Sequence, residues 1–197
     1  MNLRLSRRQF LQAGSATPFL LGTSSLLADE PRKLSANDRL TLGFIGVGTM
    51  GRGHLDGFLG MKDVQVVAVC DVVRERLDDA KQKVEKRYGA DKKAEFKGCD
   101  AYSDFRKIIE RKDIDAVVIA TPDHWHAIPC ILAAQAGKDI YCEKPLTHNI
   151  AEGRRIVETV AKHKTIFQTG SQQRSAFSNR FRLAVELVRN GRIGKVK

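Results

Sequence analysis

Residues 40–71, LTLGFIGVGTMGRGHLDGFLGMKDVQVVAVCD, decide the fold. They read in order as an apolar strand, a glycine-rich turn, a helix, a second apolar strand and an acidic residue. The turn has the spacing G-x-G-x-x-G, and Asp71 follows its third glycine by twenty residues. This combination predicts the first βαβ unit of a dinucleotide-binding fold, and the alternative is an ordinary strand-to-helix turn.

Each residue of the turn has a physical role in this prediction. Gly46 allows a sharp turn, Gly48 lets the backbone approach a pyrophosphate, and Gly51 lets the helix pack closely on the sheet. The helix begins at Thr49 and Met50, whose backbone N–H groups have no partner within the helix. Those N–H groups and the positive end of the helix dipole favour bound phosphates.

Asp71 predicts which dinucleotide is bound. Its carboxylate is placed to accept hydrogen bonds from both hydroxyls of an adenosine ribose, and it would repel a 2′-phosphate. The expected cofactor is therefore NAD. Arg74 and Arg76 follow closely and would favour a 2′-phosphate, so NADP is the alternative.

Strand and helix patterns alternate through the rest of the chain. Further strands are expected at residues 101–102, 114–120, 139–142 and 165–169. Helices are expected at residues 49–59, 73–88, 104–110 (with Ser103 as the N-cap), 124–136, 151–163 and 176–190. Alternation with short connections predicts an α/β fold with a doubly wound parallel sheet, the Rossmann arrangement.

We expect a nucleotide-binding domain at residues 39–170. Residues 171–197 would form a connecting helix and the start of a second, α+β domain. The helix places Phe177, Phe181 and Val188 on one face, which we expect to be exposed and to promote self-association.

Charge and cysteine content argue against two classes of function. The net charge is +11, but residues 29–150 carry 20 basic and 20 acidic side chains, whereas residues 151–197 carry 11 and 3. No recognised nucleic-acid motif accompanies the basic segment, so no nucleic-acid partner is expected. The four cysteines lack the spacing of a metal site or a disulfide framework, and we expect small buried residues and no bound metal.

The first 28 residues have the features of a targeting segment. Arg7 and Arg8 precede Phe10 and a weakly apolar stretch at residues 13–27, as in a twin-arginine export signal. That stretch is too short and too interrupted to span a membrane stably. We expect export to the periplasm, with an amphipathic N-terminal helix or a retained anchor as the alternatives. Residues 29–38 would form a polar linker.

Four segments together resemble the Gfo/Idh/MocA oxidoreductases, the glucose–fructose oxidoreductase and inositol dehydrogenase family. In chain order they are Gly46–Gly51, Asp71, the sequence TPDHWH at residues 121–126, and EKP at residues 143–145. The last of these is the most specific. The likeness covers residues 40–197 and implies a Rossmann domain that binds NAD(P).

The resemblance also implies roles for single residues. Thr121, Pro122 and Glu143 would line the nicotinamide end of the cleft, and Lys144 would hold a substrate hydroxyl and favour its alkoxide. Pro145 is expected to follow a cis peptide bond.

Four further residues in or beyond these segments are His126, His124, Gln172 and Arg174. His126 matches a family histidine and would serve either in catalysis or as a cap and packing residue. His124 is expected to be a surface residue. Gln172 and Arg174 would either border the substrate or belong to a surface loop.

The resemblance implies an enzyme that oxidises or reduces a secondary hydroxyl of a sugar or polyol. The alternatives are a glycoside hydrolase of the same family that retains NAD, and a dinucleotide-binding remnant without turnover. Family members have a second domain that supplies the acid–base residue, and the full-length relatives are expected to be homo-oligomers. At 197 residues the chain is expected to be a fragment or a truncated product that ends where that domain begins.

Overall fold

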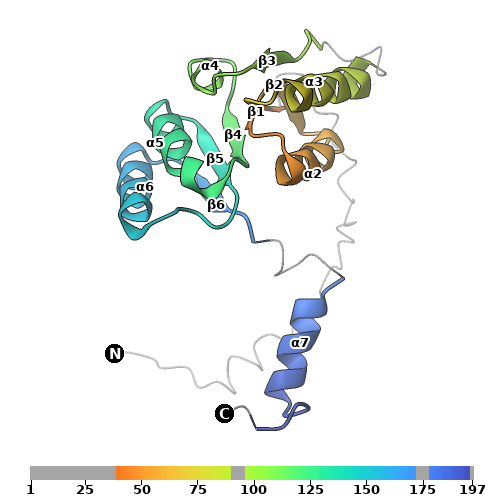
Figure 1. Cartoon of the computed structure of the whole chain (residues 1–197), viewed down its shortest axis with the longest axis vertical. Coiled ribbons are helices and arrows are strands. Elements are labelled where there is room, and N and C mark those ends of the chain that lie inside the picture. Colours follow the sequence, from red (N-terminus) through yellow and green to blue (C-terminus); the bar gives the residue numbers. More distant parts are fainter. Residues whose placement is uncertain (1–38, 90–95, 172–177, 196–197) are drawn as a thin grey trace, which may run out of the picture. The chain divides into compact units, whose positions relative to one another are not determined.

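The computed structural model describes residues 39–89, 96–171 and 178–195. Strands and helices alternate along these residues (Figure 1). The elements are β1 (Leu40–Ile45), α2 (Thr49–Leu59), β2 (Val64–Cys70), α3 (Arg74–Gly89), β3 (Asp100–Tyr102), α4 (Arg106–Ile109), β4 (Ala116–Ile119), the 3₁₀ turn η2 (Asp123–Trp125), α5 (Ala127–Gln135), β5 (Asp139–Cys142), α6 (Ile150–His163), β6 (Phe167–Thr169) and α7 (Arg180–Arg189).

The six strands form one parallel sheet in the order β3-β2-β1-β4-β5-β6. This is the strand order of a Rossmann fold, so the predicted doubly wound parallel sheet is confirmed. The strand order reverses between β1 and β4. In such sheets ligands bind outside the carboxyl ends of the strands at that reversal.

The register of the strands brings their carboxyl ends into one row. Ile45 of β1 lies beside Cys70 of β2 and beside Ile119 of β4, and Ile119 lies beside Cys142 of β5. The residues that follow these four therefore meet at the same edge of the sheet. Among them are the glycine turn, Asp71 and the residues after β4 and β5.

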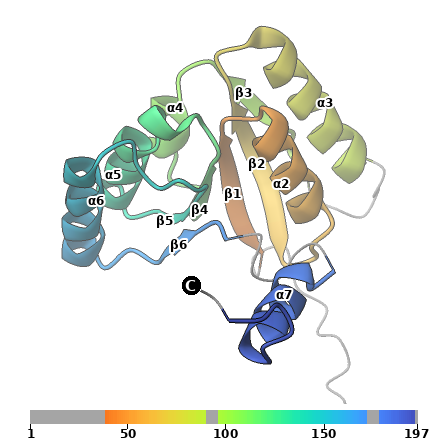
Figure 2. The ribbon, with the colours of Figure 1, turned by 60° about the horizontal axis from the view of Figure 1, so that its bottom comes forward.

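Helices cover both faces of the sheet (Figure 2). Because side chains alternate along a strand, strands such as β1, β2 and β4 contribute to two apolar clusters, one on each face of the sheet. The cluster between the sheet and helices α2 and α3 includes Leu42, Phe44, Leu55, Val66, Leu77 and Val84. The cluster between the sheet and helices α4, α5 and α6 includes Ile45, Ala68, Ile108, Cys130, Ile140 and Ile156.

Several predicted boundaries need correction. Ser103 is not the N-cap of α4, because the helix begins at Arg106 and the Asp104 carboxylate accepts from the Arg106 N–H at 2.9 Å. The helix expected at residues 124–136 is divided into η2 and α5. The strand expected at residues 114–120 is limited to four residues, Ala116–Ile119.

The last helix is shorter than predicted in the part that the structure describes. Helix α7 covers Arg180–Arg189 and ends before Gly191, which has a φ of +67° as a helix-terminating glycine requires. The predicted start at Ala176 and the side chain of Phe177 lie outside the described residues, as do the export signal and the linker. Within the described residues no helix is both long and apolar enough to cross a membrane.

Candidate cofactor and substrate site

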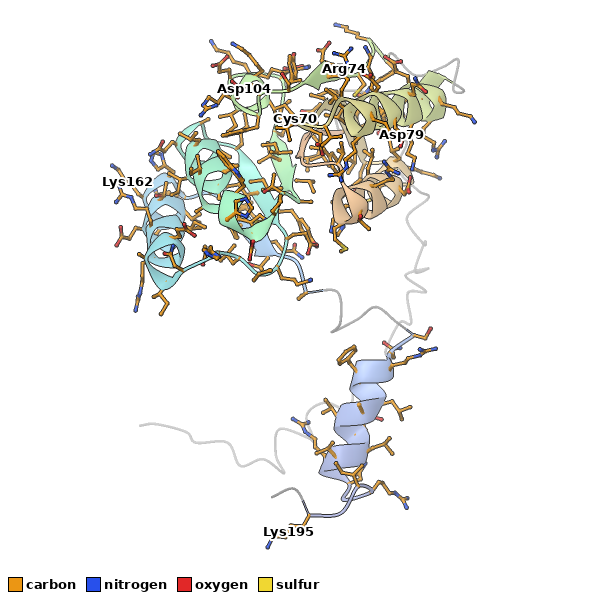
Figure 3. The ribbon with its side chains drawn as sticks, viewed as in Figure 1. Cys70, Arg74, Asp79, Asp104, Lys162 and Lys195 are labelled. Carbon is orange, nitrogen blue, oxygen red and sulfur yellow. The ribbon has the colours of Figure 1, made fainter. Side chains whose placement is uncertain are left out.

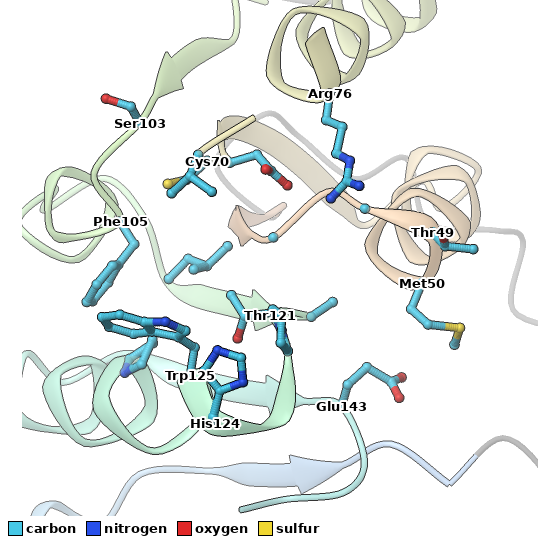
Figure 4. Close-up of a pocket in the computed structure, with 18 of the residues that line it drawn as sticks. Thr49, Met50, Cys70, Arg76, Ser103, Phe105, Thr121, His124, Trp125 and Glu143 are labelled. Carbon is cyan, nitrogen blue, oxygen red and sulfur yellow. The ribbon is translucent and has the colours of Figure 1, made fainter. Parts of the chain in front are cut away.

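A cavity of about 650 Å³ lies at the carboxyl edge of the sheet (Figure 4). The register of the strands explains its lining, because it collects residues that follow β1, β2, β4 and β5. The predicted site residues that line it are Gly46, Gly48, Thr49, Met50, Asp71, Thr121, Pro122, Glu143 and Lys144. Gly51 and His126 do not line it, and each lies behind the lining residues.

Two glycines of the turn are required by packing. Gly46 has a φ of +88°, and a Cβ atom there would lie 2.8 Å from the backbone of Ala120 and Thr121. A Cβ atom on Gly51 would lie 2.0 Å from the carbonyl oxygen of Gly46. The predicted roles of Gly46 in the sharp turn and of Gly51 in close helix packing are therefore confirmed.

Gly48 differs from these two because the protein leaves its Cβ position open. The nearest atom would be Nη1 of Arg76 at 3.4 Å, and the glycine lines the cavity. Its backbone is thus accessible from the cavity, as close approach of a pyrophosphate requires. Nothing in the geometry of the chain itself forces a glycine here.

The N-terminus of α2 has the features of an anion-binding site. Its N-cap is Gly48, no side chain caps it, and its first turn contains no acidic residue. Helix α6 shows the contrast, because the Asn149 side chain accepts from the Glu152 N–H at 2.9 Å. The N–H groups at the start of α2 therefore remain available to phosphate oxygens.

Asp71 is buried and fixes the glycine turn. One carboxylate oxygen accepts from the Val47 N–H at 2.9 Å and the other from the Val73 N–H at 2.9 Å. The side chain also lines the cavity. Because each oxygen of a carboxylate has two acceptor positions, the contacts to Val47 and Val73 leave one on each oxygen for a ribose hydroxyl.

The two arginines after β2 have different surroundings. Arg74 lies at the start of α3, where its guanidinium pairs with Asp78 at 2.9 Å and is largely exposed (Figure 3). Arg76 points from α3 toward the glycine turn and lines the cavity (Figure 4). Within the described residues Arg76 forms no ion pair. Arg76, and not Arg74, is therefore placed to contact a bound phosphate.

Aromatic side chains form the wall of the cavity beyond β3 and β4. The rings of Phe105 and Trp125 lie 6.4 Å apart in an edge-on arrangement, and both line the cavity with His124. Phe105 and Trp125 were not among the site residues predicted from the sequence. A tryptophan within the TPDHWH segment was the available signal, because that segment was already expected at the cleft.

Cys70 also lines this wall but is not a nucleophile at neutral pH. Burial, assisted by the negative charges of Asp71 and Asp104, raises its pKa to about 12. Cys99 is also buried, and burial raises its pKa to about 12. The prediction that the cysteines are small buried residues is confirmed, because all four are buried and unpaired by disulfides.

Thr121 has a buried hydroxyl group whose oxygen has no hydrogen-bond partner among the described residues, although the residue lines the cavity. Buried polar groups are normally satisfied, so this atom is explained by a ligand or an ordered water. It lies where the family resemblance expects the nicotinamide end of a cofactor.

His126 is enclosed behind the cavity, with an exposed fraction of 1%. Its Nδ1 lies 2.8 Å from the carbonyl oxygen of Pro145 and its Nε2 lies 2.7 Å from that of Thr121. Burial lowers the pKa of His126, but the hydrogen bonds to Cys142 and to these two carbonyls outweigh it and raise the pKa to about 9.

This placement favours the packing role that was one of the two expected for His126. Two carbonyl oxygens accept from both ring nitrogens only when the imidazole carries both protons. The ring therefore joins the segment after β4 to the segment after β5 and has no nitrogen directed into the cavity.

Glu143 and Lys144 follow β5. The Glu143 carboxylate is buried and accepts from the Lys144 N–H at 3.1 Å, whereas the Lys144 side chain is exposed and lines the cavity. The peptide bond between Lys144 and Pro145 is cis, as predicted. His54, which the sequence analysis missed, lies 2.5 Å from Glu143 through its Nε2 atom.

These features fit a bound dinucleotide. The open Gly48, the uncapped start of α2 and the Arg76 guanidinium together suit a pyrophosphate. Asp71 suits a ribose, and the unpartnered Thr121 hydroxyl suits a polar group at the other end of the cavity. Gln172 and Arg174, expected at the border of the substrate, lie outside the described residues.

Comparison with known proteins identifies the family. Residues 40–171 match the model of an oxidoreductase family with an NAD-binding Rossmann fold, the Gfo/Idh/MocA family. The chain belongs to this family. The family's NAD-binding Rossmann fold agrees with the predicted NAD cofactor, with NADP as the alternative, and the resemblance drawn from the four sequence segments is confirmed.

Two relatives of this Gfo/Idh/MocA protein are named for different activities. A myo-inositol 2-dehydrogenase of Thermotoga maritima is 33% identical over 156 residues, which cover 79% of this chain and 42% of the relative. A glycosyl hydrolase family 109 protein of Shewanella pealeana is 34% identical, with coverage of 81% of this chain and 38% of the relative. The chain therefore spans less than half the length of these relatives.

A solved structure is also similar to this chain over less than half of its own length. Scyllo-inositol dehydrogenase from Lactobacillus casei, determined with bound NAD(H) and scyllo-inositol, has a TM-score of 0.64 and 28% sequence identity. The match covers 80% of this chain and 43% of that one. The similarity is thus to the nucleotide-binding part of a longer enzyme.

Proposed function

We propose that this chain is the cofactor-binding part of an NAD-dependent oxidoreductase that acts on a secondary hydroxyl of a sugar or polyol. One observation carries the proposal. One cavity is lined both by the residues that suit a dinucleotide, Gly48 and Asp71, and by Lys144. The dehydrogenases among the relatives support the class of substrate.

Lys144 is the residue of this chain that would act on the substrate. A bound nicotinamide supplies the group that accepts or donates hydride. The Lys144 ammonium would hold the substrate hydroxyl and stabilise the negative charge that develops on its oxygen. The burial of Glu143 and its bond to the Lys144 backbone fix the start of this segment.

Titration with NADH and with a panel of free sugars and inositols tests the proposal. The chain contains one tryptophan, Trp125, and it lines the cavity, so its fluorescence reports binding. We expect NADH to quench it, and substrate-dependent NADH formation from the full-length enzyme to fall by about 10²–10³-fold in Lys144→Ala. Unchanged fluorescence at saturating NADH would reject the proposal.

A second candidate is a glycoside hydrolase that retains its NAD. The similarity to the glycosyl hydrolase family 109 protein is as high as that to the dehydrogenase, so sequence identity does not choose between them. Cleavage of aryl glycosides without net NADH formation would favour the hydrolase. Net NADH formation without cleavage would favour the dehydrogenase.

The preference for NAD over NADP follows from Asp71. Its buried carboxylate faces the cavity, where a 2′-phosphate would meet a negative charge. We expect tighter binding of NAD than of NADP, and about a tenfold smaller ratio of the two affinities in Asp71→Asn, which removes the charge. The amide oxygen can accept from only one of the Val47 and Val73 N–H groups, so the ratio of the two affinities, and not either affinity alone, is the measure. Equal affinities in the unmodified chain would contradict this assignment.

We also propose export by the twin-arginine route. The Arg7–Arg8 pair ahead of a weakly apolar stretch supports it. Replacing both arginines by lysine should keep the protein in the cytoplasm, as fractionation of cells would show. Unchanged export of the double variant would favour another route.

A further inference from the structure

His54 is a partly buried titratable group to which the proposed chemistry gives no role. It lies on α2, five residues after the helix begins at Thr49. Its Nε2 atom is 2.5 Å from Oε1 of Glu143, which is 89 residues away in the sequence. The side chains are 17% and 4% exposed, so solvent screens this contact little.

Other residues surround the Glu143 carboxylate. The Tyr141 hydroxyl donates to Oε1 at 3.4 Å, and the Tyr141 ring meets the His54 ring edge-on with centroids 5.2 Å apart. A Cβ atom on Gly170 would lie 2.7 Å from Oε1, so the end of β6 closes tightly over the carboxylate. Oε2 accepts from the Lys144 N–H.

The same helix therefore reaches two parts of the site. Its N-terminus faces the position of the pyrophosphate, and His54 lies about 7.5 Å further along at 1.5 Å per residue. Through Glu143, His54 is connected to the peptide N–H of Lys144. If α2 shifts or tightens when a phosphate binds, these contacts would transmit the movement over this short distance to the lysine segment.

We propose that His54 is a positioning residue that couples phosphate binding at the glycine turn to the orientation of Lys144. The inference rests on the proposed function, because it gives Lys144 the role of holding the substrate. The alternative is that the contact between His54 and Glu143 only stabilises the fold.

The experiment measures Lys144 directly and needs no turnover. Adenosine diphosphate serves as the probe, because it carries adenosine and pyrophosphate but no nicotinamide ribose that could cover the lysine. The rate of acetylation of Lys144 by an amine-selective reagent is measured by peptide mass spectrometry with and without the probe. Lys107, on the surface at α4, is the internal reference.

In the unmodified chain we expect the probe to change the acetylation rate of Lys144 by about fivefold or more. His54→Leu should bind the probe, as Trp125 fluorescence shows, but reduce this response to less than about twofold. His54→Gln keeps an N–H donor near the position of Nε2 and should retain the response. The matched control His163→Leu removes an exposed histidine of α6 and should respond like the unmodified chain.

The outcomes separate the two proposals. A full response in folded His54→Leu, or no response in the unmodified chain that binds the probe, overturns the role of His54. No binding of the probe to the unmodified chain overturns the dinucleotide site itself. If His54→Leu does not fold, His54→Asn replaces it, because its shorter polar side chain does not reach Glu143.

Discussion

At the scale of the residue, two arginines separated by one position show how surroundings decide function. Arg74 pairs with Asp78 on the outside of α3, whereas Arg76 lies over the glycine turn beside Gly48. In the sequence both were equal candidates for contact with the 2′-phosphate of NADP. Only the direction of each side chain distinguishes them.

We predict that Arg76→Gln weakens NAD binding by about tenfold, because a charge-assisted contact to phosphate contributes about 1.5 kcal/mol or more. Arg74→Gln, the matched control, should change the affinity by less than about twofold since its charge is already paired. Calorimetric titration with NAD measures both. Similar losses in the two variants would show that general positive charge, and not position, attracts the cofactor.

His126 gives the stability a dependence on pH. Its pKa is raised from 6.5 to about 9 in the folded state, so the native protein binds this proton more tightly than the unfolded chain. The resulting stabilisation is complete below pH 6.5 and is lost as the pH rises through about 9. Its size is on the order of 3 kcal/mol at 1.36 kcal/mol per pKa unit.

We therefore expect the free energy of unfolding to fall between pH 6.5 and about pH 9. His126→Gln should remove the part of this fall that comes from the loss of the His126 proton. Urea unfolding at a series of pH values measures it. His163→Gln is the control, because that histidine is exposed in the last turn of α6. An unchanged pH profile in His126→Gln would mean that the ring is neutral in the folded protein.

At the scale of the element, helix α2 contains one glycine that close packing requires and another at which a side chain would fit. Gly51 packs against the backbone of the turn, whereas a Cβ atom at Gly53 would meet no atom within 4 Å. A glycine in a helix is otherwise destabilising relative to alanine. The two positions therefore form a matched pair within one helix.

We predict that Gly51→Ala lowers the free energy of unfolding by about 3 kcal/mol or more, because its Cβ would lie 2.0 Å from the Gly46 carbonyl oxygen. Gly53→Ala should raise it by about 0.5–1 kcal/mol. Thermal and denaturant unfolding measure both. Equal effects of the two substitutions would contradict the packing role of Gly51.

At the scale of the whole molecule, the nucleotide-binding domain has a complete core, and α7 differs from it. All ten residues of α7 are exposed. Its apolar side chains are 41–56% exposed and comprise Phe181, Leu183, Val185, Leu187 and Val188. Exposed apolar surface of this kind favours association.

We predict that the purified chain self-associates and that replacing Leu183 and Leu187 by lysine reduces the association. Val157→Lys is the control, because this side chain is 60% exposed on α6 within the domain. Sedimentation velocity measures the distribution of species. The same distribution in the Leu183/Leu187 variant as in the control would exclude α7 as the cause.

The class of fold, the glycine turn and Asp71 were predicted from the amino-acid sequence, whereas the roles of the Glu-Lys-Pro segment came from the resemblance to the family. The first three depend on neighbours along the chain: apolar periodicity, a turn that only glycine can adopt, and spacing within one βαβ unit. For the same reason the start of α2 at Thr49 was predicted correctly. The N-cap at Ser103 failed because Asp104, one residue later, takes that hydrogen bond.

Only the tertiary structure decided which distant residues meet. The contact of His54 with Glu143 joins α2 to the end of β5, and the hydrogen bonds of His126 join the segment after β4 to the segment after β5. Both contacts form because β1, β4 and β5 end side by side at one edge of the sheet. Strand register is set by the packing of both faces of the sheet, and no local pattern contains it. The sequence therefore predicted the parts of the site, and the sheet determined how they are joined.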